Sequence, residues 1–342
     1  MTSSVVFRLV GALAGAALAV AGVVAVPAAA ADTPSAGAAA AARESGVVRQ
    51  AAAVDADDHR RVLDYWTRER MAAAVPLVRA LDGVAGGLLG TARPGGQAAA
   101  DTRPGGQVAV PQAAAASSTG ERWSGGGRVA KTTGRVFLTL DGRDFTCSAA
   151  VVSAQNRDTV ITAGHCLKDG TGGWADNWTF VPGYADGESP YGRYTARQMF
   201  VAPQWADKAD DSYDFGMAVL NRSGDHHVQD RTGAHPVSFG TAPGDPTYAF
   251  GYPATGRFDG SRLHYCAGAT TPDDGGTTAS GMACTMTEGS SGGPWLADFD
   301  PASGKGTVVS VISFKYADDT RTQYGPFLGD AARRVFDRAA SF

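Results

Sequence analysis

Residues 121–342 predict an all-β fold. In this part of the sequence, short apolar runs rich in β-branched and aromatic residues are separated by turns containing Gly, Asp, Asn and Pro. The runs expected to form strands are 136–140, 149–152, 159–162, 248–250 and 308–312. Residues 329–338 have helical spacing and predict a short C-terminal helix. The pattern is typical of one all-β domain.

Residues 1–31 are predicted to be a secretory signal peptide. Arg8 precedes a run of Ala, Val, Leu and Gly, and the small residues at its end favour cleavage after one of residues 29–31. The alternative is a membrane anchor, because residues 9–26 approach the length of a membrane span. No later stretch is long and apolar enough to cross a bilayer, so no membrane association is expected after cleavage.

Residues 32–120 are expected to be a pro-segment or linker, largely disordered and with one short helix. The stretch is rich in Ala and repeats Arg-Pro-Gly-Gly-Gln at 93–97 and 103–107. The apolar positions that fit one amphipathic helix, broken near residue 76, are Val62, Leu63, Trp66 and Met71. This helix either covers a functional site before processing or serves as a spacer in folding or export.

The charge balance is mildly acidic. The chain has 30 Lys and Arg against 34 Asp and Glu, a net charge of −4, and it has no basic run. Nucleic acid is therefore not expected as a partner. The composition suits a soluble secreted protein, and we expect a monomer.

Two short strings carry the chemistry. Thr-Ala-Gly-His-Cys at 162–166 contains His165, and Glu-Gly-Ser-Ser-Gly-Gly-Pro at 288–294 contains Ser291. A serine hydroxyl is a weak nucleophile until a neighbouring imidazole takes its proton, so each string needs the other. The glycines beside Ser291 allow a tight turn that can direct backbone N–H groups at a developing oxyanion.

Asp214 is the best candidate for the acid that orients the imidazole. It precedes the alternating apolar positions of 215–219, which predict a strand with one buried face. An aspartate at the mouth of such a strand can hold one histidine tautomer. Asp210 and Asp211 are competing candidates, which are otherwise expected to lie in a solvated loop.

These strings and the segment that begins at Asp214 resemble the active-site segments of chymotrypsin-like serine peptidases. The resemblance covers nearly all of residues 123–342, and it is closest to secreted bacterial trypsin-like peptidases related to glutamyl endopeptidases. It implies two antiparallel six-stranded β-barrels with the active site between them, followed by a closing helix. It also implies an oxyanion hole formed by the N–H groups of Gly289 and Ser291.

The order of the candidates excludes a second hydrolase class. Residues 289–293 also satisfy Gly-x-Ser-x-Gly, the nucleophile motif of α/β-hydrolases, in which the histidine follows the serine. The last histidine here is His264, so the order is His165, Asp214, Ser291, as in the chymotrypsin-like enzymes.

One departure from the animal enzymes concerns maturation. Residue 290 is Ser where they carry Asp, and no sequence like Ile-Val-Gly-Gly begins the domain. Activation through an ion pair with a new amino terminus is therefore not expected.

The four cysteines agree with export to an oxidising compartment. Four cysteines allow three pairings. The resemblance implies a disulfide between Cys147 and Cys166, which leaves Cys266 and Cys284 to pair. A zinc site is the alternative, but no Cys-x-x-Cys is present and His165 has another role, so we expect neither a metal nor a cofactor.

The resemblance also points to a primary specificity pocket containing Thr285, Ser313 and Lys315. Thr285 lies six residues before Ser291, where Arg/Lys-specific members carry Asp. A hydroxyl cannot compensate a buried cation, so cleavage after Arg or Lys is not expected. The stretch 308–314 lacks the His of glutamyl-specific relatives. An uncharged, medium-sized residue is the first expectation, and Glu or Asp, received by Lys315, is the second.

Together these features predict a secreted serine endopeptidase that acts on polypeptide substrates through an acyl-enzyme. Two alternatives remain. One is a non-catalytic, protease-like binding protein, and the other is an esterase that uses the same triad.

Overall fold

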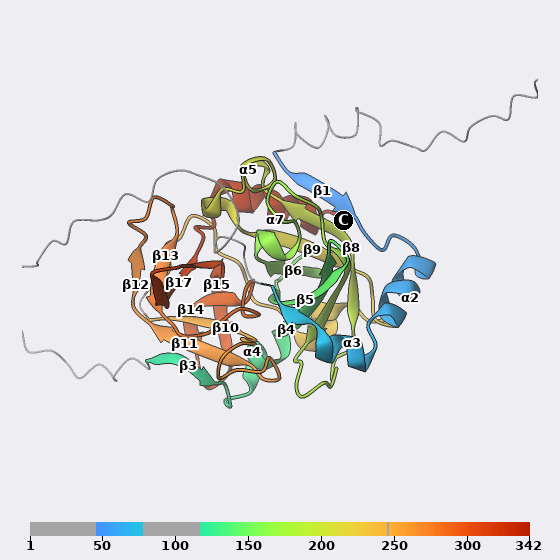
Figure 1. Ribbon diagram of the computed structural model, residues 1–342, viewed down its shortest axis with the longest axis horizontal. Coiled ribbons are helices and arrows are strands. Elements are labelled where there is room, and N and C mark those ends of the chain that lie inside the picture. Colours follow the sequence, from blue (N-terminus) through green and yellow to red (C-terminus); the bar gives the residue numbers. More distant parts are fainter. Residues whose placement is uncertain (1–45, 78–116, 245) are drawn as a thin grey trace, which may run out of the picture.

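The computed structural model describes residues 46–77, 117–244 and 246–342, which form two β-rich halves packed side by side (Figure 1). An eight-stranded sheet makes up the first half, and a five-stranded and a four-stranded sheet make up the second. The helices are short and lie around these sheets (Figure 1). The all-β prediction is confirmed.

Six strands of the first half close into an antiparallel barrel in the order β4-β5-β6-β9-β8-β7, because β7 pairs again with β4. Their bounds are β4 Thr133–Leu140, β5 Arg143–Val151, β6 Thr159–Thr162, β7 Asp176–Pro182, β8 Tyr194–Val201 and β9 Gly216–Leu220. Successive side chains of a strand point to opposite faces. Val136 and Leu138 accordingly pack in the barrel interior, and Phe137 packs in a second hydrophobic cluster outside it.

The strands of the second half lie in two sheets. The larger sheet contains β3 Ser118–Arg122, β10 Thr247–Gly251, β11 His264–Gly268, β14 Pro294–Asp300 and β15 Lys305–Val311. The smaller contains β12 Thr270–Pro272, β13 Ser280–Ala283, β16 Phe314–Tyr316 and β17 Asp319–Gly325. A disulfide joins Cys266 of β11 to Cys284, which follows β13. In place of the second closed barrel that the resemblance implied, the described residues thus form two linked sheets.

The predicted C-terminal helix is α7, Asp330–Ala340. Its buried residues, Ala331, Ala332, Val335 and Ala339, recur at helical spacing. They pack in the cluster that also contains Met217 and Val219 of β9, so the helix covers the outside of the barrel.

Residues 46–77 have more structure than the sequence predicted. They form β1 Val48–Ala51, α2 Ala56–Tyr65, α3 Arg68–Ala73 and β2 Val75–Pro76. β1 pairs with β8, and β2 pairs with β5. The prediction of one helix is wrong because Thr67 caps a second helix, its Oγ1 accepting a hydrogen bond from Arg70 N at 3.2 Å. Pro76 lies in β2 and breaks no helix.

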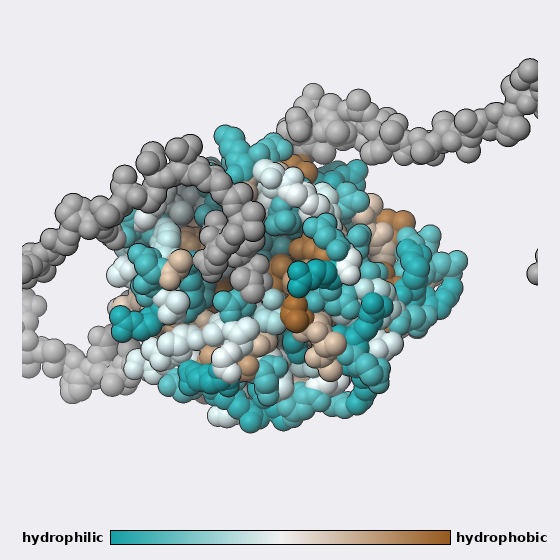
Figure 2. All heavy atoms as spheres, viewed as in Figure 1, coloured by the Kyte–Doolittle hydropathy of each residue, from teal (hydrophilic) through white to brown (hydrophobic). Residues whose placement is uncertain are grey.

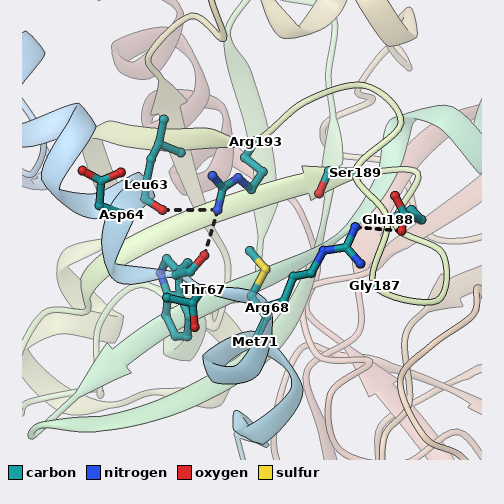
Figure 3. A pocket seen from close by; sticks show the side chains of 10 residues that line it. Leu63, Asp64, Thr67, Arg68, Met71, Gly187, Glu188, Ser189 and Arg193 are labelled. Carbon is teal, nitrogen blue, oxygen red and sulfur yellow. Dashed lines mark hydrogen bonds and ion pairs between the residues drawn. The ribbon is translucent and has the colours of Figure 1, made fainter.

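Two arginine side chains fasten α2 and α3 to the first half (Figure 3). Arg193 Nη1 donates hydrogen bonds to the carbonyl oxygens of Leu63 at 3.2 Å and Trp66 at 2.8 Å. Arg68 forms an ion pair with Glu188 at 2.9 Å. Orphan carbonyls at the end of α2 thus find a donor on the barrel.

The remaining short helices are α4 Gly127–Thr132, α5 Pro203–Lys208 and α6 Val228–Thr232. On the face in Figure 2 most residues are hydrophilic, and hydrophobic ones form small patches. Within the part of the chain that the structure describes, the exposed large hydrophobic residues are Val54, Val75 and Phe327.

None of the helices described is long and apolar enough to cross a membrane. The expected signal peptide, residues 1–31, and the repeats at 93–97 and 103–107 lie outside the described residues, so these predictions remain untested. β3 begins at Ser118, three residues before the predicted start of the domain at 121.

Candidate active site

His165 lies in a single 3₁₀ turn, Gly164–Cys166, that directly follows β6. A disulfide from Cys166 to Cys147 holds this turn against β5, and Trp178 Nε1 donates to the Cys166 carbonyl at 2.8 Å. The His165 side chain is buried. The two disulfides are those that the resemblance implied.

Asp214 lies just before β9, which pairs antiparallel with β6. The end of β6 and the start of β9 therefore meet, as the pairing of Thr162 with Gly216 indicates. The Asp214 carboxylate accepts the His165 backbone N–H on Oδ1 at 2.8 Å and the His165 Nδ1–H on Oδ2 at 2.8 Å. Because a carboxylate can only accept, Nδ1 carries the proton and Nε2 is the basic nitrogen.

The competing aspartate Asp210 has a different role. Its Oδ1 accepts the Ser212 N–H at 3.0 Å and caps the short 3₁₀ helix Asp211–Tyr213. It is Asp214 whose carboxylate contacts the imidazole.

Ser313, which the sequence predicted to line the substrate pocket, directs its hydroxyl at Asp214. Its Oγ donates a 2.5 Å hydrogen bond to Asp214 Oδ2, and the side chain is buried. The carboxylate thus accepts hydrogen bonds from the backbone and the ring of His165 and from a residue of the second half. The sequence did not indicate this contact, because Ser313 and Asp214 are 99 positions apart.

The position before His165 requires glycine because it lies against the Asp214 carboxylate. A Cβ atom at this position would lie 3.0 Å from Asp214 Oδ1 and 2.9 Å from the Trp205 ring. A larger residue would therefore push the carboxylate away from the imidazole.

The Ser291 loop, residues 288–293, forms hydrogen bonds with both halves of the molecule. On one side, the Ser291 carbonyl accepts the Ser148 N–H of β5 at 2.7 Å. On the other side, Gly292 N donates to the Ile312 carbonyl at 2.7 Å, and Ile312 N donates to the Gly293 carbonyl at 2.8 Å. Cys166 Sγ lies 3.6 Å from the Ser291 carbonyl oxygen, so the nucleophile candidate adjoins the histidine turn. The His165 Nε2 atom has no hydrogen-bond partner among the described residues.

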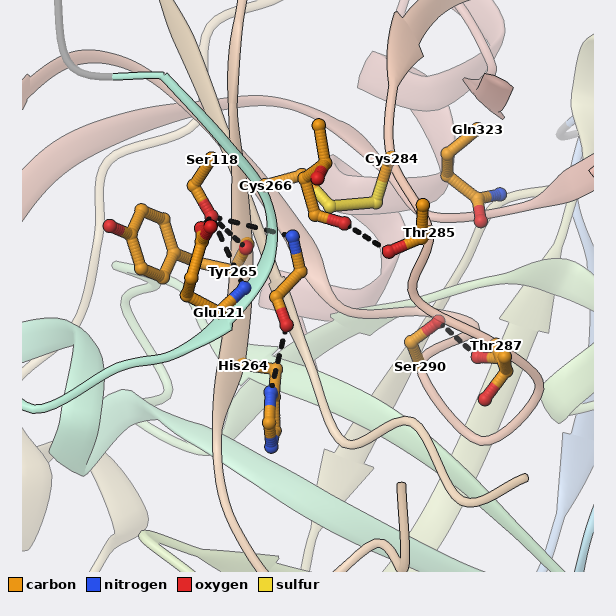
Figure 4. Close-up of a disulfide and its surroundings, with 12 residues drawn as sticks. Ser118, Glu121, His264, Tyr265, Cys266, Cys284, Thr285, Thr287, Ser290 and Gln323 are labelled. Carbon is orange, nitrogen blue, oxygen red and sulfur yellow. Dashed lines mark hydrogen bonds between the residues drawn. A yellow bond between two sulfur atoms is a disulfide. The ribbon is translucent and has the colours of Figure 1, made fainter. Parts of the chain in front are cut away.

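Ser290 and Ser291 differ in environment although they are neighbours. The Ser290 hydroxyl donates to the Thr287 carbonyl at 2.6 Å (Figure 4), and its side chain is almost completely buried. Ser291 is 8% exposed, against 1% for Ser290. Ser290 is therefore engaged within its own loop.

The backbone at Gly289 has a conformation that favours glycine. Its φ is +94°, and a Cβ atom would lie 2.7 Å from the Tyr252 carbonyl oxygen. Ser148 Oγ donates to the Gly289 carbonyl at 2.9 Å and accepts the Tyr252 N–H at 2.9 Å, which fixes the peptide plane. In the described part of the chain, the N–H groups of Gly289 and Ser291 donate to no protein acceptor.

A pocket of 530 Å³ opens beside the Ser291 loop. Its lining includes Met286, Thr287, Glu288, Lys315, Tyr316 and Thr320. Lys315 Nζ donates to the Cys284 carbonyl at 2.6 Å and to the Thr320 carbonyl at 2.7 Å, which leaves one ammonium proton. Burial lowers the pKa of Lys315 to about 8, although Glu288 and Asp319 act to raise it.

Thr285 does not line this pocket. Its hydroxyl donates to the Thr119 carbonyl of β3 and accepts a hydrogen bond from Arg257 Nη2 at 3.0 Å (Figure 4 shows Thr285 beside the disulfide). The Thr285 hydroxyl is thus bound to groups of β3 and to Arg257, and its assignment to the pocket base stays a prediction. β3 comes from a stretch that the sequence assigned partly to the linker, so this neighbour was not foreseen.

Comparisons with known proteins give the family. The family model described as Trypsin matches residues 124–328, more than half of the chain, so the chain belongs to the trypsin family of serine proteases. The crystal structure of protease Anisep from Arthrobacter nicotinovorans is 39% identical, covers 62% of this chain and 96% of its own, and has a TM-score of 0.59. The thermostable serine protease AL20 from an extremophilic microorganism is 38% identical over 63% of this chain and 99% of its own, with a TM-score of 0.59.

Two further matches add less, one because its identity is low and one because it is short. A Glu endopeptidase, solved in complex with MPD, is 19% identical over 66% of this chain and 97% of its own, with a TM-score of 0.53, and this likeness shows the fold alone. An extracellular metalloprotease of Bacillus subtilis (strain 168) is 38% identical over 68 residues, 20% of this chain. The match spans only 22% of that curated relative.

One group of potential metal ligands occurs among the described residues, and it contains Cys147, His165 and Cys166. The two sulfur atoms are joined in a disulfide, so they cannot act as thiolate ligands. The imidazole is already hydrogen-bonded to Asp214 through Nδ1. This group does not fit a metal site.

Proposed function

We propose that the chain is a secreted serine endopeptidase in which Ser291 is the nucleophile, His165 the general base and Asp214 the orienting acid. The observation that carries the proposal is the hydrogen bond from His165 Nδ1 to the Asp214 carboxylate. This hydrogen bond leaves Nε2 as the basic nitrogen of His165. The next residue, Cys166, contacts the Ser291 backbone, so His165 and Ser291 belong to adjoining segments.

Catalysis begins when Ser291 Oγ attacks the carbonyl carbon of the scissile bond and its proton passes to His165 Nε2. The carbonyl electron pair moves to the oxygen, and the N–H groups of Gly289 and Ser291 stabilise this oxyanion by about 3–4 kcal/mol each. Collapse of the intermediate expels the amine, which takes the proton from His165, and leaves acyl-Ser291. Water repeats the two steps and releases the acid. Asp214 stays ionised and stabilises the imidazolium.

The pocket favours an acidic residue before the scissile bond, the second of the two expectations from the sequence. Lys315 supplies the positive charge in the pocket lining. The third N–H of its ammonium group can donate a hydrogen bond to the carboxylate of a substrate Glu or Asp. Glu288 also lines the pocket, but its Oε2 accepts the Thr255 hydroxyl at 2.6 Å. Lys315 would repel Arg and Lys. This argument replaces the one from Thr285.

The proposal includes export and processing. Residues 1–31 are the leader, residues 32–120 the pro-segment and residues 121–342 the catalytic domain, which acts as a monomer. Both disulfides suit an oxidising compartment. Ser290 offers no carboxylate, and its hydroxyl is bound to Thr287, so activity needs no ion pair with a new amino terminus.

The test is to incubate the purified protein with a denatured protein, with and without a fluorophosphonate, and to map the cuts by mass spectrometry. We expect cuts that the inhibitor and Ser291→Ala abolish and that Ser290→Ala retains. A non-catalytic binding protein would give neither cuts nor labelling. An esterase would hydrolyse esters but leave the protein intact. Either result would overturn the proposal.

A further inference from the structure

One edge of β5 carries both β2 and the Ser291 loop. The other edge pairs with β4 along its length, from Arg143 to Ala150. On the edge away from β4, Val75 and Pro76 pair in parallel with Phe145 and Thr146. Leu77 N donates to the Thr146 carbonyl at 3.0 Å.

The Ser291 loop follows directly on this edge. Ser148 N donates to the Ser291 carbonyl at 2.7 Å, and beyond it Ala150 and Val151 pair with β6. Thr146 and Ser148 are two residues apart on an extended strand, a distance of about 7 Å. The tip of β2 therefore lies immediately beside the proposed nucleophile.

β2 and the pocket lie on opposite sides of Ser291. The loop is bonded to Ser148 of β5 on one side and to Ile312 on the other, and the chain after Ile312 leads to Lys315 in the pocket. A substrate whose side chain enters the pocket must therefore direct its leaving group toward β5. No residue of 46–77 is in the pocket lining.

A free strand edge binds extended polypeptide through backbone hydrogen bonds. The edge groups of β5 next to Ser148 are the ones that substrate residues after the scissile bond can pair with. Val75–Leu77 hold this position, because Leu77 N already uses the Thr146 carbonyl.

The rest of the segment is bound to the barrel through contacts that do not involve the Ser291 loop. Trp66 is 1% exposed, packs against Phe137 with ring centroids 5.5 Å apart, and donates from Nε1 to the Asn177 carbonyl at 2.6 Å. Tyr65 donates to Asp144 at 2.6 Å, and Arg193 holds the end of α2. None of these contacts depends on residues 78–116, so a cut there leaves them in place.

We propose that residues 46–77 are an inhibitor that occupies the β5 edge beside Ser291 and excludes the substrate residues that follow the scissile bond, even after one cut between residues 78 and 116. The proposal rests on the proposed function. It predicts inhibition that depends on the leaving group: long leaving groups are excluded, and small ones are not.

The test compares kcat/KM for two substrates with the same residues before the scissile bond. One ends in p-nitroanilide, and the other continues for four residues within a quenched fluorescent peptide. Leu77→Pro removes the N–H donor to Thr146, and Trp66→Ala removes the main anchor. Arg60→Gln is the matched control, because Arg60 is exposed and pairs with Asp57 of the same helix.

We expect Leu77→Pro and Trp66→Ala to raise the ratio of peptide to anilide turnover at least tenfold, and Arg60→Gln to leave it unchanged. An unchanged ratio in all variants would overturn the inference, and so would an equal rise for both substrates. Equal fluorophosphonate labelling rates verify that each variant is folded. If no form were labelled and neither substrate were hydrolysed, the proposed function itself would fail.

A second measurement does not depend on those variants. A recognition site for an unrelated protease is placed between residues 93 and 107, and the full chain is cut there. We expect the N-terminal fragment to stay bound and the substrate ratio to stay low. A tenfold rise on cutting alone would show that the tether, and not the contacts, holds the segment, and the inference would be wrong.

Discussion

The two sides of Ser291 belong to different halves of the molecule and differ in how they recognise a chain. On the second-half side there is a 530 Å³ pocket with an ammonium group, that of Lys315. On the first-half side there is a strand edge, and residues 75–77 of the same chain are paired to it.

This difference determines what each side can discriminate. A pocket recognises the size and charge of one side chain, whereas a strand edge offers backbone groups that any extended segment can satisfy. An internal segment can therefore occupy the edge without a matching side chain. In our proposal the pocket side supplies selectivity, and the edge side is where the chain controls access.

The largest effect is expected from substitution of the proposed nucleophile and base, which lie between the two sides. Ser291→Ala and His165→Ala should each lower kcat about 10⁴-fold or more, and the double variant should lose little further, because the residues act as one unit. Steady-state kinetics on the anilide substrate measure this. Ser290→Ala is the matched control and should stay within tenfold of the parent. An additive loss in the double variant would separate the two residues and contradict the mechanism.

Next in size is the charge of the pocket. Lys315→Met should reduce the preference for Glu over Gln before the scissile bond at least about 30-fold, since the loss of one partner of a buried charge pair costs about 2 kcal/mol or more. A peptide-library profile measures this preference. The exposed lysine Lys305 provides the control, Lys305→Met. A profile dominated by Arg or Lys in the parent protein would mean that Glu288 governs the pocket.

The same preference should depend on pH. Burial lowers the pKa of Lys315 to about 8, so the ammonium is charged below pH 8 and loses its proton as the pH rises through that value. The kcat/KM ratio for Glu over Gln substrates, which reports on the free enzyme, should fall above pH 8. Lys315→Arg should move this fall to higher pH. A ratio that is flat from pH 6 to 10 would exclude Lys315 as the acid-binding group.

The smallest effect is expected from loss of the hydrogen bond between Ser313 of the second half and Asp214 of the first. Ser313→Ala removes one of the hydrogen bonds that the Asp214 carboxylate accepts, and a hydrogen bond to a charged group contributes about 1.5–3 kcal/mol. Since His165 keeps its two bonds, we expect kcat to fall about tenfold with KM nearly unchanged. Ser313→Thr should restore kcat. A change confined to KM would show that Ser313 acts on substrate binding and not through Asp214.

The sequence was most informative where neighbouring residues share one task. His165 and Ser291 could be predicted as base and nucleophile because these roles need particular neighbours, such as the glycines around Ser291. Asp214 was identifiable because it precedes a buried strand. The alternation of apolar residues likewise indicated the β-rich fold.

The sequence was least informative where the partner is distant along the chain. β1 and β2 form because the edges of β8 and β5 are available, and nothing within residues 46–77 reveals those edges. The hydrogen bond from Thr285 to Thr119 was likewise not foreseen, because Thr119 comes from a strand expected to be linker.

Labelling of the uncut protein with a fluorophosphonate tests the central claim most directly. Fluoride is a small leaving group, so β2 should not prevent the reaction. We predict one label per chain, located on Ser291 by mass spectrometry, in the parent and in Ser290→Ala, and none in His165→Ala. Labelling of Ser290, or an unchanged labelling rate in His165→Ala, would contradict the account.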